Sequence, residues 1–240
     1  GFLALETGRL HGVDATAAGL AIEMVHAYSL IHDDLPCMDD DDLRRGKPTI
    51  HKQWDEAVAV LAGDALLTMA FEVLGDADCP EASQLQLIRS MALAAGTKGM
   101  IGGQMLDIAA ETAKSPLTLD QITTLQNGKT GALITWSCLV GPRIAGESGA
   151  ALRIYGDALG LAFQIADDIL DVEGDAAAVG KAVRKDDAAG KATFVSLLGL
   201  AGAKGRATEL VTQACDALEP YGDDAETLRA AARFVIDRDR

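Results

Sequence analysis

Apolar residues recur at spacings of three and four along most of the chain, which is the period of an amphipathic α-helix. Strand signals are sparse, because β-branched alternation is rare and aromatic residues make up only 4% of the sequence. The pattern therefore predicts an all-α fold. Helices are expected at residues 14–31, 57–74, 81–96, 119–144, 150–170, 193–199, 203–218 and 224–237.

Short polar turns separate the predicted helices, and several of these helices are apolar around most of their circumference. The turns at 75–83, 114–118 and 219–224 combine proline or glycine with capping residues. Residues 131–141 (GALITWSCLVG) are typical of a helix enclosed by other helices. Because no linker or shift in composition divides the chain, we expect residues 1–240 to form one domain, a helical bundle.

The chain is strongly acidic, with 36 Asp and Glu residues against 21 Lys and Arg residues, a net charge of −15. This balance argues against a nucleic-acid partner, since no broad cationic surface is available to meet phosphates, and it suits divalent cations better. No apolar run approaches the roughly 18–20 residues that cross a bilayer, so we expect no membrane insertion and a cytoplasmic location. The four cysteines form no CxxC pair and indicate neither a zinc site nor a disulfide framework.

Two segments place a pair of aspartates at the end of an apolar helical stretch. They are LIHDDLPCMD at 30–39 and QIADDILD at 164–171, and two such helices could face each other across a bundle interior. In the second segment, Asp167 and Asp171 are four residues apart, so they project from one face of a helix and can share a cation. Carboxylates that emerge from an apolar surface need a metal or a basic partner.

The first segment contains a proline between its aspartates. Pro36 has no backbone N–H to donate and clashes with the carbonyl of the preceding turn, so we expect a local bulge after Asp33 and Asp34. Such a bulge could bring Asp39 back toward Asp33. Asp39 and the acidic residues at 40–42 also have a plainer explanation as a solvated turn, and for 40–42 that explanation remains open.

The candidate ligands are carboxylates, which favour Mg²⁺ over softer metals. Because Mg²⁺ commonly binds through one or two carboxylates plus the phosphates of a substrate, the pattern predicts a phosphorylated ligand. Basic side chains would supply the direct phosphate contacts. The candidates are Arg44, Arg45, Lys129, Lys181 and Lys191.

Six segments in order along the chain resemble the trans-isoprenyl diphosphate synthase (polyprenyl synthetase) family. They are DDLPCMDDDDLRRGKPT, GDALL, GGQMLD, GKTGALI, FQIADDILD and GKATF. The resemblance covers essentially the whole chain and implies the isoprenoid synthase fold, a bundle of helices around a deep central cavity. A GGKRxRP-like basic segment usually precedes these motifs in the family and is not seen here, so a segment is expected to be missing from the N-terminus.

The resemblance also implies roles for individual residues. Three Mg²⁺ ions on an allylic diphosphate would have Asp33, Asp39 and Asp167 as principal ligands, assisted by Asp34, Asp168 and Asp171. The allylic diphosphate would be held by Arg44, Lys129 and Lys181, isopentenyl diphosphate by Arg45 and His26, with Lys191 a further substrate contact. The backbone carbonyls of Lys129 and Thr130 and the side chain of Gln164 would stabilise the allylic cation.

The implied reaction extends dimethylallyl and geranyl diphosphates with isopentenyl diphosphate. Tyr28 lies five residues before Asp33, about 7.5 Å toward the helix start, and with Ser29 it would form a floor that stops growth at fifteen carbons. Tyr28 is equally compatible with ordinary core packing, and His26 with a hydrogen-bonded core histidine. The alternatives are a geranylgeranyl diphosphate synthase, a terpene cyclase, which DDILD argues against, and a non-catalytic metal-binding subunit. A homodimer is expected from the resemblance alone.

Overall fold

The computed structural model describes residues 1–113, 115–173 and 192–238. Its helices are α1 (Phe2–Leu10), α2 (Thr16–Asp33), α3 (Ile50–Gln53), α4 (Glu56–Gly75), α5 (Glu81–Ala95), α6 (Met100–Glu111), α7 (Leu119–Gln126), α8 (Ala132–Cys138), α9 (Val140–Ala145), α10 (Ala150–Glu173), α13 (Phe194–Ala217) and α14 (Glu226–Asp237). A π-helical turn, η1 (Asn127–Gly131), joins α7 to α8, and a 3₁₀ segment, η2 (Glu219–Ala225), precedes α14. The strands β1 (Leu43–Arg44) and β2 (Lys47–Pro48) form a small antiparallel hairpin.

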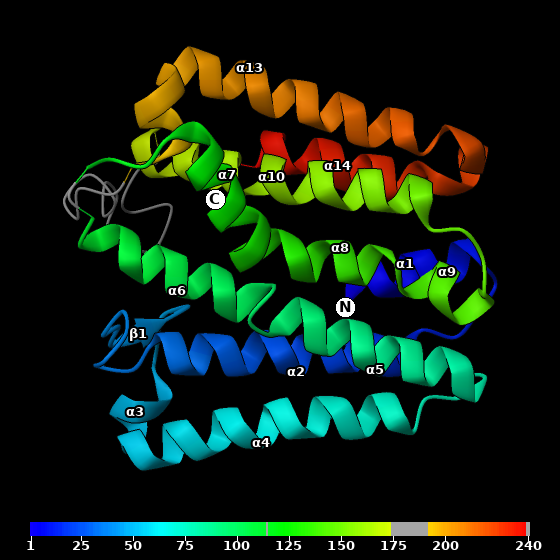
Figure 1. Cartoon of the computed structure of the whole chain (residues 1–240), viewed down its shortest axis with the longest axis horizontal. Helices are drawn as coiled ribbons and strands as arrows, with labels where there is room; N and C mark the ends of the chain where they lie inside the picture. The colour runs from blue at the N-terminus through cyan, green and yellow to red at the C-terminus, as the bar shows by residue number, and fades with distance from the viewer. Residues whose placement is uncertain (114, 174–191, 239–240) are drawn as a thin grey trace.

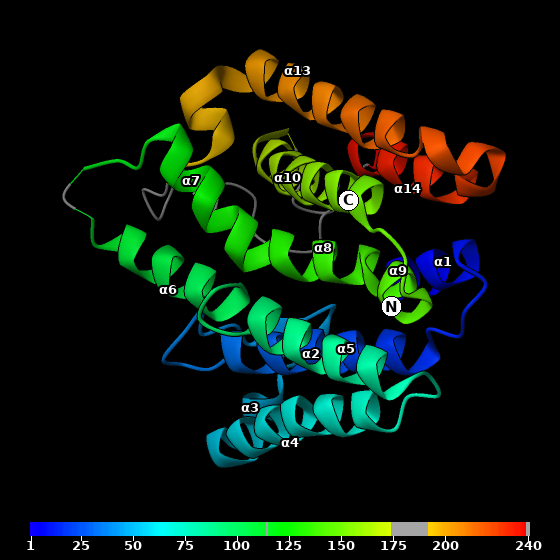
Figure 2. The same cartoon turned by 45° about the vertical axis from the view of Figure 1, so that its right-hand side comes forward.

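The long helices run roughly parallel to one another in stacked layers (Figure 1). Helix α13 lies on one side next to α10 and α14, α8 lies near the middle, and α2 and then α4 form the other side, in the same order when the molecule is turned (Figure 2). Helix α10 packs against α13, and α2 packs against α4. The expected all-α bundle is confirmed, with the short hairpin as its β-structure in the described residues.

Two clusters of buried side chains form the core, and α8 contributes to both. Cys138 belongs to the cluster around α10, α13 and α14, whereas Trp136 belongs to the cluster around α2, α4 and α5. The polar atoms of Trp136 and Tyr155 are satisfied, because Trp136 Nε1 donates to Ser90 Oγ at 2.9 Å and Tyr155 Oη donates to the Leu228 carbonyl at 2.8 Å. Helix α8 is therefore the central wall of the bundle.

Five of the predicted helices, at 14–31, 57–74, 81–96, 150–170 and 224–237, are confirmed as α2, α4, α5, α10 and α14 with small differences at their ends. The predicted separation of 193–199 from 203–218 corresponds to a break inside α13. There Gly199 has φ 69° and ψ 159°, outside helical values.

The prediction of one continuous helix at 119–144 is wrong. The chain forms α7, η1, α8 and α9 in that range, because the hydrogen-bond register widens at residues 127–131 and Leu139 leaves helical geometry with ψ 3°. Helices α1, α3 and α6 and the hairpin lie outside the predicted elements. In α6 the consecutive Gly102 and Gly103 lower helix propensity, and the tertiary contact that requires Gly103 is described below.

Helix α4 meets the length and composition expected of a membrane span, which the sequence prediction did not anticipate. Only 22% of its apolar window is buried in the structure. Its packed face contacts α2, while its other face exposes Leu61 to 66% and Met69 to 44%. Asp64 lies on that exposed face, so the apolar stripe carries a charge.

Candidate active site

A cavity of about 900 Å³ lies between α1, α2, α6, α8, α10 and α14. Most of its wall is apolar, with Met105, Leu133 and Phe163 among the lining side chains. Polar side chains also line it, among them Asp33, His26, Gln104, Lys129 and Thr130. The arrangement fits a ligand with a polar head and a long apolar tail.

The end of α2 positions the first acidic motif. The helix stops at Asp33, and the Asp39 backbone N–H then donates to the Asp33 carbonyl at 2.8 Å. The bulge expected around Pro36 and the return of Asp39 toward Asp33 are therefore confirmed.

Asp33 is the titratable group in this cavity with a strongly perturbed pKa. Desolvation by burial raises the pKa of Asp33 to about 6, opposed by the Lys129 charge and reinforced by the Asp39 and Asp34 carboxylates. Ionisation of the Asp33 carboxyl group is therefore costly in the metal-free protein, and a bound cation beside it would stabilise the ionised form. This is the environment expected of a metal ligand.

Asp34, unlike Asp33, is paired with a basic side chain, Arg44. The Asp34 side chain is only 4% exposed, and it accepts hydrogen bonds from Arg44 Nε at 2.9 Å and Arg44 Nη2 at 2.5 Å. Bidentate pairing of this kind holds the guanidinium in one orientation and raises the pKa of Arg44. Arg44 is the last residue of β1, and the turn residues that follow it, Arg45 and Gly46, both have positive φ, 53° and 75°, as in a two-residue type I′ turn.

His26 and Arg45, which the sequence assigns to one substrate, are close enough to influence each other electrostatically. The pKa of His26 is lowered, chiefly by desolvation and further by the charges of Arg45 and Arg44, while Glu23 opposes the shift. His26 also lines the cavity. The neutral imidazole is therefore favoured in the ligand-free protein, where His26 can donate one hydrogen bond.

The π-helical turn η1 carries Lys129 and Thr130 into the cavity. Lys129 Nζ lies 2.5 Å from Asp107 Oδ2 of α6, and Thr130 Oγ1 donates to Gln164 Oε1 at 3.3 Å. The predicted Thr130 and Gln164 are thus brought together from η1 and α10. π-Helical turns are rare and are frequent at functional sites.

Helix α6 reaches η1 only because Gly103 has no side chain. A Cβ at Gly103 would lie 2.1 Å from the Lys129 backbone nitrogen, well inside contact distance. The second glycine of GGQMLD therefore positions Lys129 through packing. The sequence motif drew attention to this segment without assigning a role to Asp107, which is 14% exposed by its side chain.

In the second acidic motif the three aspartates have different environments. Asp167 pairs with Arg238, whose guanidinium also lies 4.1 Å above the Phe163 ring. Asp168 is 5% exposed and accepts a hydrogen bond at 2.7 Å from the Phe194 backbone N–H at the start of α13. Asp171 is half-buried one turn after Asp167. Asp168 thus ties α10 to α13, which is a structural contribution beside its predicted role as a ligand.

Tyr28 and Ser29 both line the cavity, as the prediction of a floor requires. Tyr28 is 5% exposed, its ring meets that of His32 edge to face at 5.6 Å, and its hydroxyl has no hydrogen-bond partner among the residues that the structure describes. Ser29 Oγ donates to the His26 carbonyl at 2.9 Å. The Tyr28 ring therefore contributes bulk rather than hydrogen bonding.

Among the described residues, one group of three acidic or histidine side chains is compact enough to share a cation, and it lies outside the two predicted acidic motifs' ligand set. The ligand atoms of Asp40, Asp42 and His51 lie within 4.8 Å of one another. Asp40 and Asp42 belong to the segment for which a solvated turn is the plainer explanation, and the sequence analysis gives His51 no role. They are grouped by the hairpin, since Thr49 binds the backbone of Asp41 and also contacts His51.

Three residues of the site have no role in the sequence prediction, and two predicted residues lie outside the part of the chain that the structure describes. Asp107, Gln104 and Arg238 enter the site through tertiary packing and carry no predicted role. The predicted phosphate contacts Lys181 and Lys191 lie outside the described residues.

Comparison with known proteins gives consistent results at the sequence level. The polyprenyl synthetase family model matches residues 3–229. The chain is 46% identical to the farnesyl diphosphate synthase of Escherichia coli (strain K12) over 254 residues, which cover 100% of this chain and 84% of that protein. It is 45% identical to the farnesyl diphosphate synthase of Haemophilus influenzae, covering 99% of this chain and 82% of that protein.

Solved structures show the same similarity. An FPP/GFPP synthase from Zymomonas mobilis has a TM-score of 0.88 and 47% identity, covering 97% of this chain and 81% of that chain. A geranylgeranyl pyrophosphate synthetase from Pyrococcus horikoshii has a TM-score of 0.89 at 30% identity, covering 99% and 84%. With both acidic motifs placed on α2 and α10 of this bundle, the chain belongs to the polyprenyl synthetase family.

Proposed function

We propose that the protein is a Mg²⁺-dependent trans-prenyltransferase that condenses isopentenyl diphosphate with dimethylallyl and geranyl diphosphates to form farnesyl diphosphate. The observation that carries the proposal is that Asp33 and Lys129 line the same largely apolar cavity, close enough for the Lys129 charge to act on the Asp33 carboxyl group. A carboxylate and an ammonium group there suit a metal-bound diphosphate, and the apolar wall suits a prenyl chain. The chain acts as a single domain.

The donor set fits Mg²⁺. The proposed ligands Asp33, Asp39 and Asp167, assisted by Asp34, Asp168 and Asp171, offer carboxylate oxygen, which hard divalent cations prefer. The raised pKa of Asp33, caused first by burial, supports a cation at this position. Three ions per site are proposed from the family resemblance. When bound, Mg²⁺ would neutralise charge on the allylic diphosphate as it departs.

The chain's own residues would hold the two substrates in position. Lys129, with Arg44 and Lys181, would bind the allylic diphosphate, and Asp107 would orient the Lys129 ammonium from 2.5 Å. Arg45 and His26 would bind isopentenyl diphosphate, and Lys191 would add a further contact.

The carbonyl oxygens of Lys129 and Thr130 and the amide oxygen of Gln164 would face the developing allylic cation. The prenyl chain would extend along the apolar wall toward Tyr28 and Ser29, which limit its length.

Product analysis tests this function. Purified protein is incubated with Mg²⁺, labelled isopentenyl diphosphate and, separately, dimethylallyl, geranyl and farnesyl diphosphate. Farnesyl product from the two shorter primers, with none from farnesyl diphosphate, is the expected result. Twenty-carbon or longer products would replace the proposal with a longer-chain synthase. No condensation at all would reject prenyl transfer and favour a cyclase or a non-catalytic subunit. The Asp33→Asn variant serves as the inactive control.

We further propose a cytoplasmic homodimer in which the exposed apolar face of α4 forms the interface. The face includes Val60, Leu61 and Met69, exposed to 40%, 66% and 44%. Burial of such a stripe against a second copy explains its hydropathy without membrane insertion. Sedimentation should give a dimer for the wild type and a monomer for Leu61→Glu. A wild-type monomer, or association of the protein with lipid vesicles, would contradict this arrangement.

A further inference from the structure

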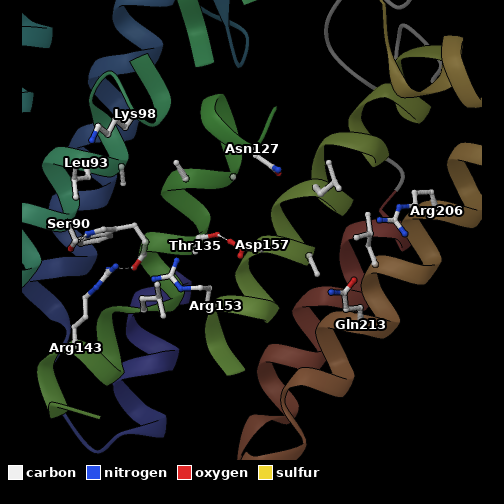
Figure 3. Close-up of a pocket in the computed structure, with 18 residues that line it drawn as sticks. Ser90, Leu93, Lys98, Asn127, Thr135, Arg143, Arg153, Asp157, Arg206 and Gln213 are labelled. Carbon is white, nitrogen blue, oxygen red and sulfur yellow. Dashed lines mark hydrogen bonds between the residues drawn. The ribbon is translucent and has the colours of Figure 1, made fainter. Parts of the chain in front are cut away.

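A second cavity, of about 740 Å³, lies between α5, α8, α9, α10 and α13. Helix α8 separates it from the first cavity, since Leu133, Ile134 and Ser137 line the first, whereas Thr135 and Trp136 line the second. Figure 3 shows side chains converging on it from both sides. Its volume falls within the range of about 300–1,000 Å³ that is typical of small-molecule sites.

Basic side chains surround this cavity although the chain as a whole is strongly acidic. Lys98 follows α5, Arg143 lies on α9, Arg153 on α10 and Arg206 on α13 (Figure 3). Asp157 is the single carboxylate in the lining and accepts a hydrogen bond from Thr135 Oγ1 at 2.7 Å. Four cations against one anion form a local charge opposite to the net charge of −15.

These cations are poorly compensated within the protein. Among the residues that the structure describes, Lys98, Arg143 and Arg153 form no ion pair, while Arg206 pairs with Glu209 at 3.1 Å on the surface. Arg143 is half-buried, and its Nη1 donates to the Trp136 carbonyl at 3.2 Å. Burial, with a smaller contribution from Arg153, lowers the pKa of Arg143 to about 10. An anion placed between these two guanidinium groups would offset the cost of burying the Arg143 charge and its repulsion by Arg153.

The remaining wall of the cavity is apolar. Leu93, Trp136, Leu139, Leu161 and Leu210 contribute to it from α5, α8, α10 and α13 and from the residue between α8 and α9. Leu93 is 56% exposed and Leu161 is half-buried, whereas Trp136, Leu139 and Leu210 are buried at the base of the cavity. A bare anion would leave Leu93 and Leu161 in contact with water, whereas an uncharged apolar molecule would leave the half-buried Arg143 guanidinium without an anionic partner. The two halves of the lining together select a molecule with an anionic head and an apolar chain.

We propose that this second cavity is a binding site for a soluble anionic amphiphile, a phosphate or diphosphate ester of a single apolar chain. The anionic head lies between Arg143 and Arg153, with Lys98 and Arg206 at the margin. The chain lies against Trp136 and the neighbouring leucines. Because α8 stands between the two cavities, this ligand is distinct from any prenyl substrate bound on the other face.

Trp136 provides a direct probe of occupancy. The chain has two tryptophans, Trp54 and Trp136, so a Trp54→Phe protein reports fluorescence from the cavity alone. This protein is titrated with decyl phosphate below its micelle concentration in metal-free buffer. We expect a saturable change, with binding at least tenfold weaker for inorganic phosphate and for uncharged decanol.

Variants locate the site without requiring turnover, so failure of the proposed reaction and failure of this site are distinguishable. Arg153→Gln and Arg143→Gln should each weaken decyl phosphate binding about tenfold, as loss of a charge-assisted hydrogen bond predicts. Arg89→Gln, an exposed arginine of α5 outside the lining, and Arg45→Gln, beside the first cavity, should leave it unchanged. The proposal is overturned by a non-saturable signal, by equal binding to the Arg153 and Arg143 variants, or by binding to phosphatidylglycerol vesicles but not to monomeric decyl phosphate.

Discussion

The backbone N–H of Asp39 donates to the carbonyl of Asp33 at 2.8 Å, which folds the chain after α2 back onto the end of the helix. The contact brings two carboxylates together, and Asp39 contributes to the raised pKa of Asp33. Pro36 makes this arrangement possible, because α2 cannot continue through it as a regular helix. A local break in one helix thus concentrates negative charge at the proposed metal site.

The pKa of Asp33 predicts how the stability of the metal-free protein depends on pH. Its folded-state pKa of about 6 exceeds the ordinary 3.8, so between these values the folded protein holds a proton that the unfolded chain releases. Stability therefore falls as pH rises from about 4 to about 6, and stays lower above. Asp33→Asn should remove this contribution. Thermal unfolding in a chelating buffer at several pH values measures it, and parallel curves for both proteins would contradict the assignment.

Asp107 is expected to act through Lys129. Asp107→Asn should weaken the orientation of the ammonium and lower kcat/KM about tenfold, the effect of losing one charge-assisted hydrogen bond. Lys129→Gln removes the proposed diphosphate contact itself and should lower kcat/KM further. Steady-state kinetics with geranyl diphosphate distinguish the two, and Asp120→Asn, at an exposed position in the first turn of α7, is the control. Equal losses in both site variants would mean that Asp107 contacts the substrate or metal directly.

Gly103 should tolerate no side chain. Gly103→Ala places a Cβ 2.1 Å from the Lys129 backbone nitrogen, so α6 and η1 must separate, at a cost of about 1–3 kcal/mol in the free energy of unfolding. Activity should fall with it, since η1 carries Lys129 and Thr130. Gly205→Ala is a matched control, because no atom lies within 4 Å of a Cβ at that position in α13. Denaturant unfolding compares the two, and equal stabilities would show that α6 adjusts without strain.

Some contacts of the site can be predicted from the sequence and others cannot. The return of Asp39 was predictable because its cause, Pro36, lies within the same short segment. The partner of Lys129 was not, since Asp107 is 22 residues away and meets it only when α6 packs on η1. The same holds for Arg238, which reaches Asp167 from the end of the described chain. A break in a helix is predictable because the residues that cause it are close in sequence. Contacts between helices depend on tertiary packing, which the hydrophobic periodicity does not specify.

Product length should depend on the bulk of Tyr28 and not on its hydroxyl. The hydroxyl is buried and has no hydrogen-bond partner in the described part of the chain, so Tyr28→Phe should preserve the fifteen-carbon product and hold or slightly raise stability. Tyr28→Ala removes the ring from the cavity lining and should shift the product toward twenty carbons, at a cost in stability of about 3–5 kcal/mol for a buried aromatic residue. Chromatography of the dephosphorylated products reads out chain length directly. If Tyr28→Ala folds and still stops at fifteen carbons, the floor lies elsewhere in the cavity, and Ser29→Ala would then have no reason to change the product either.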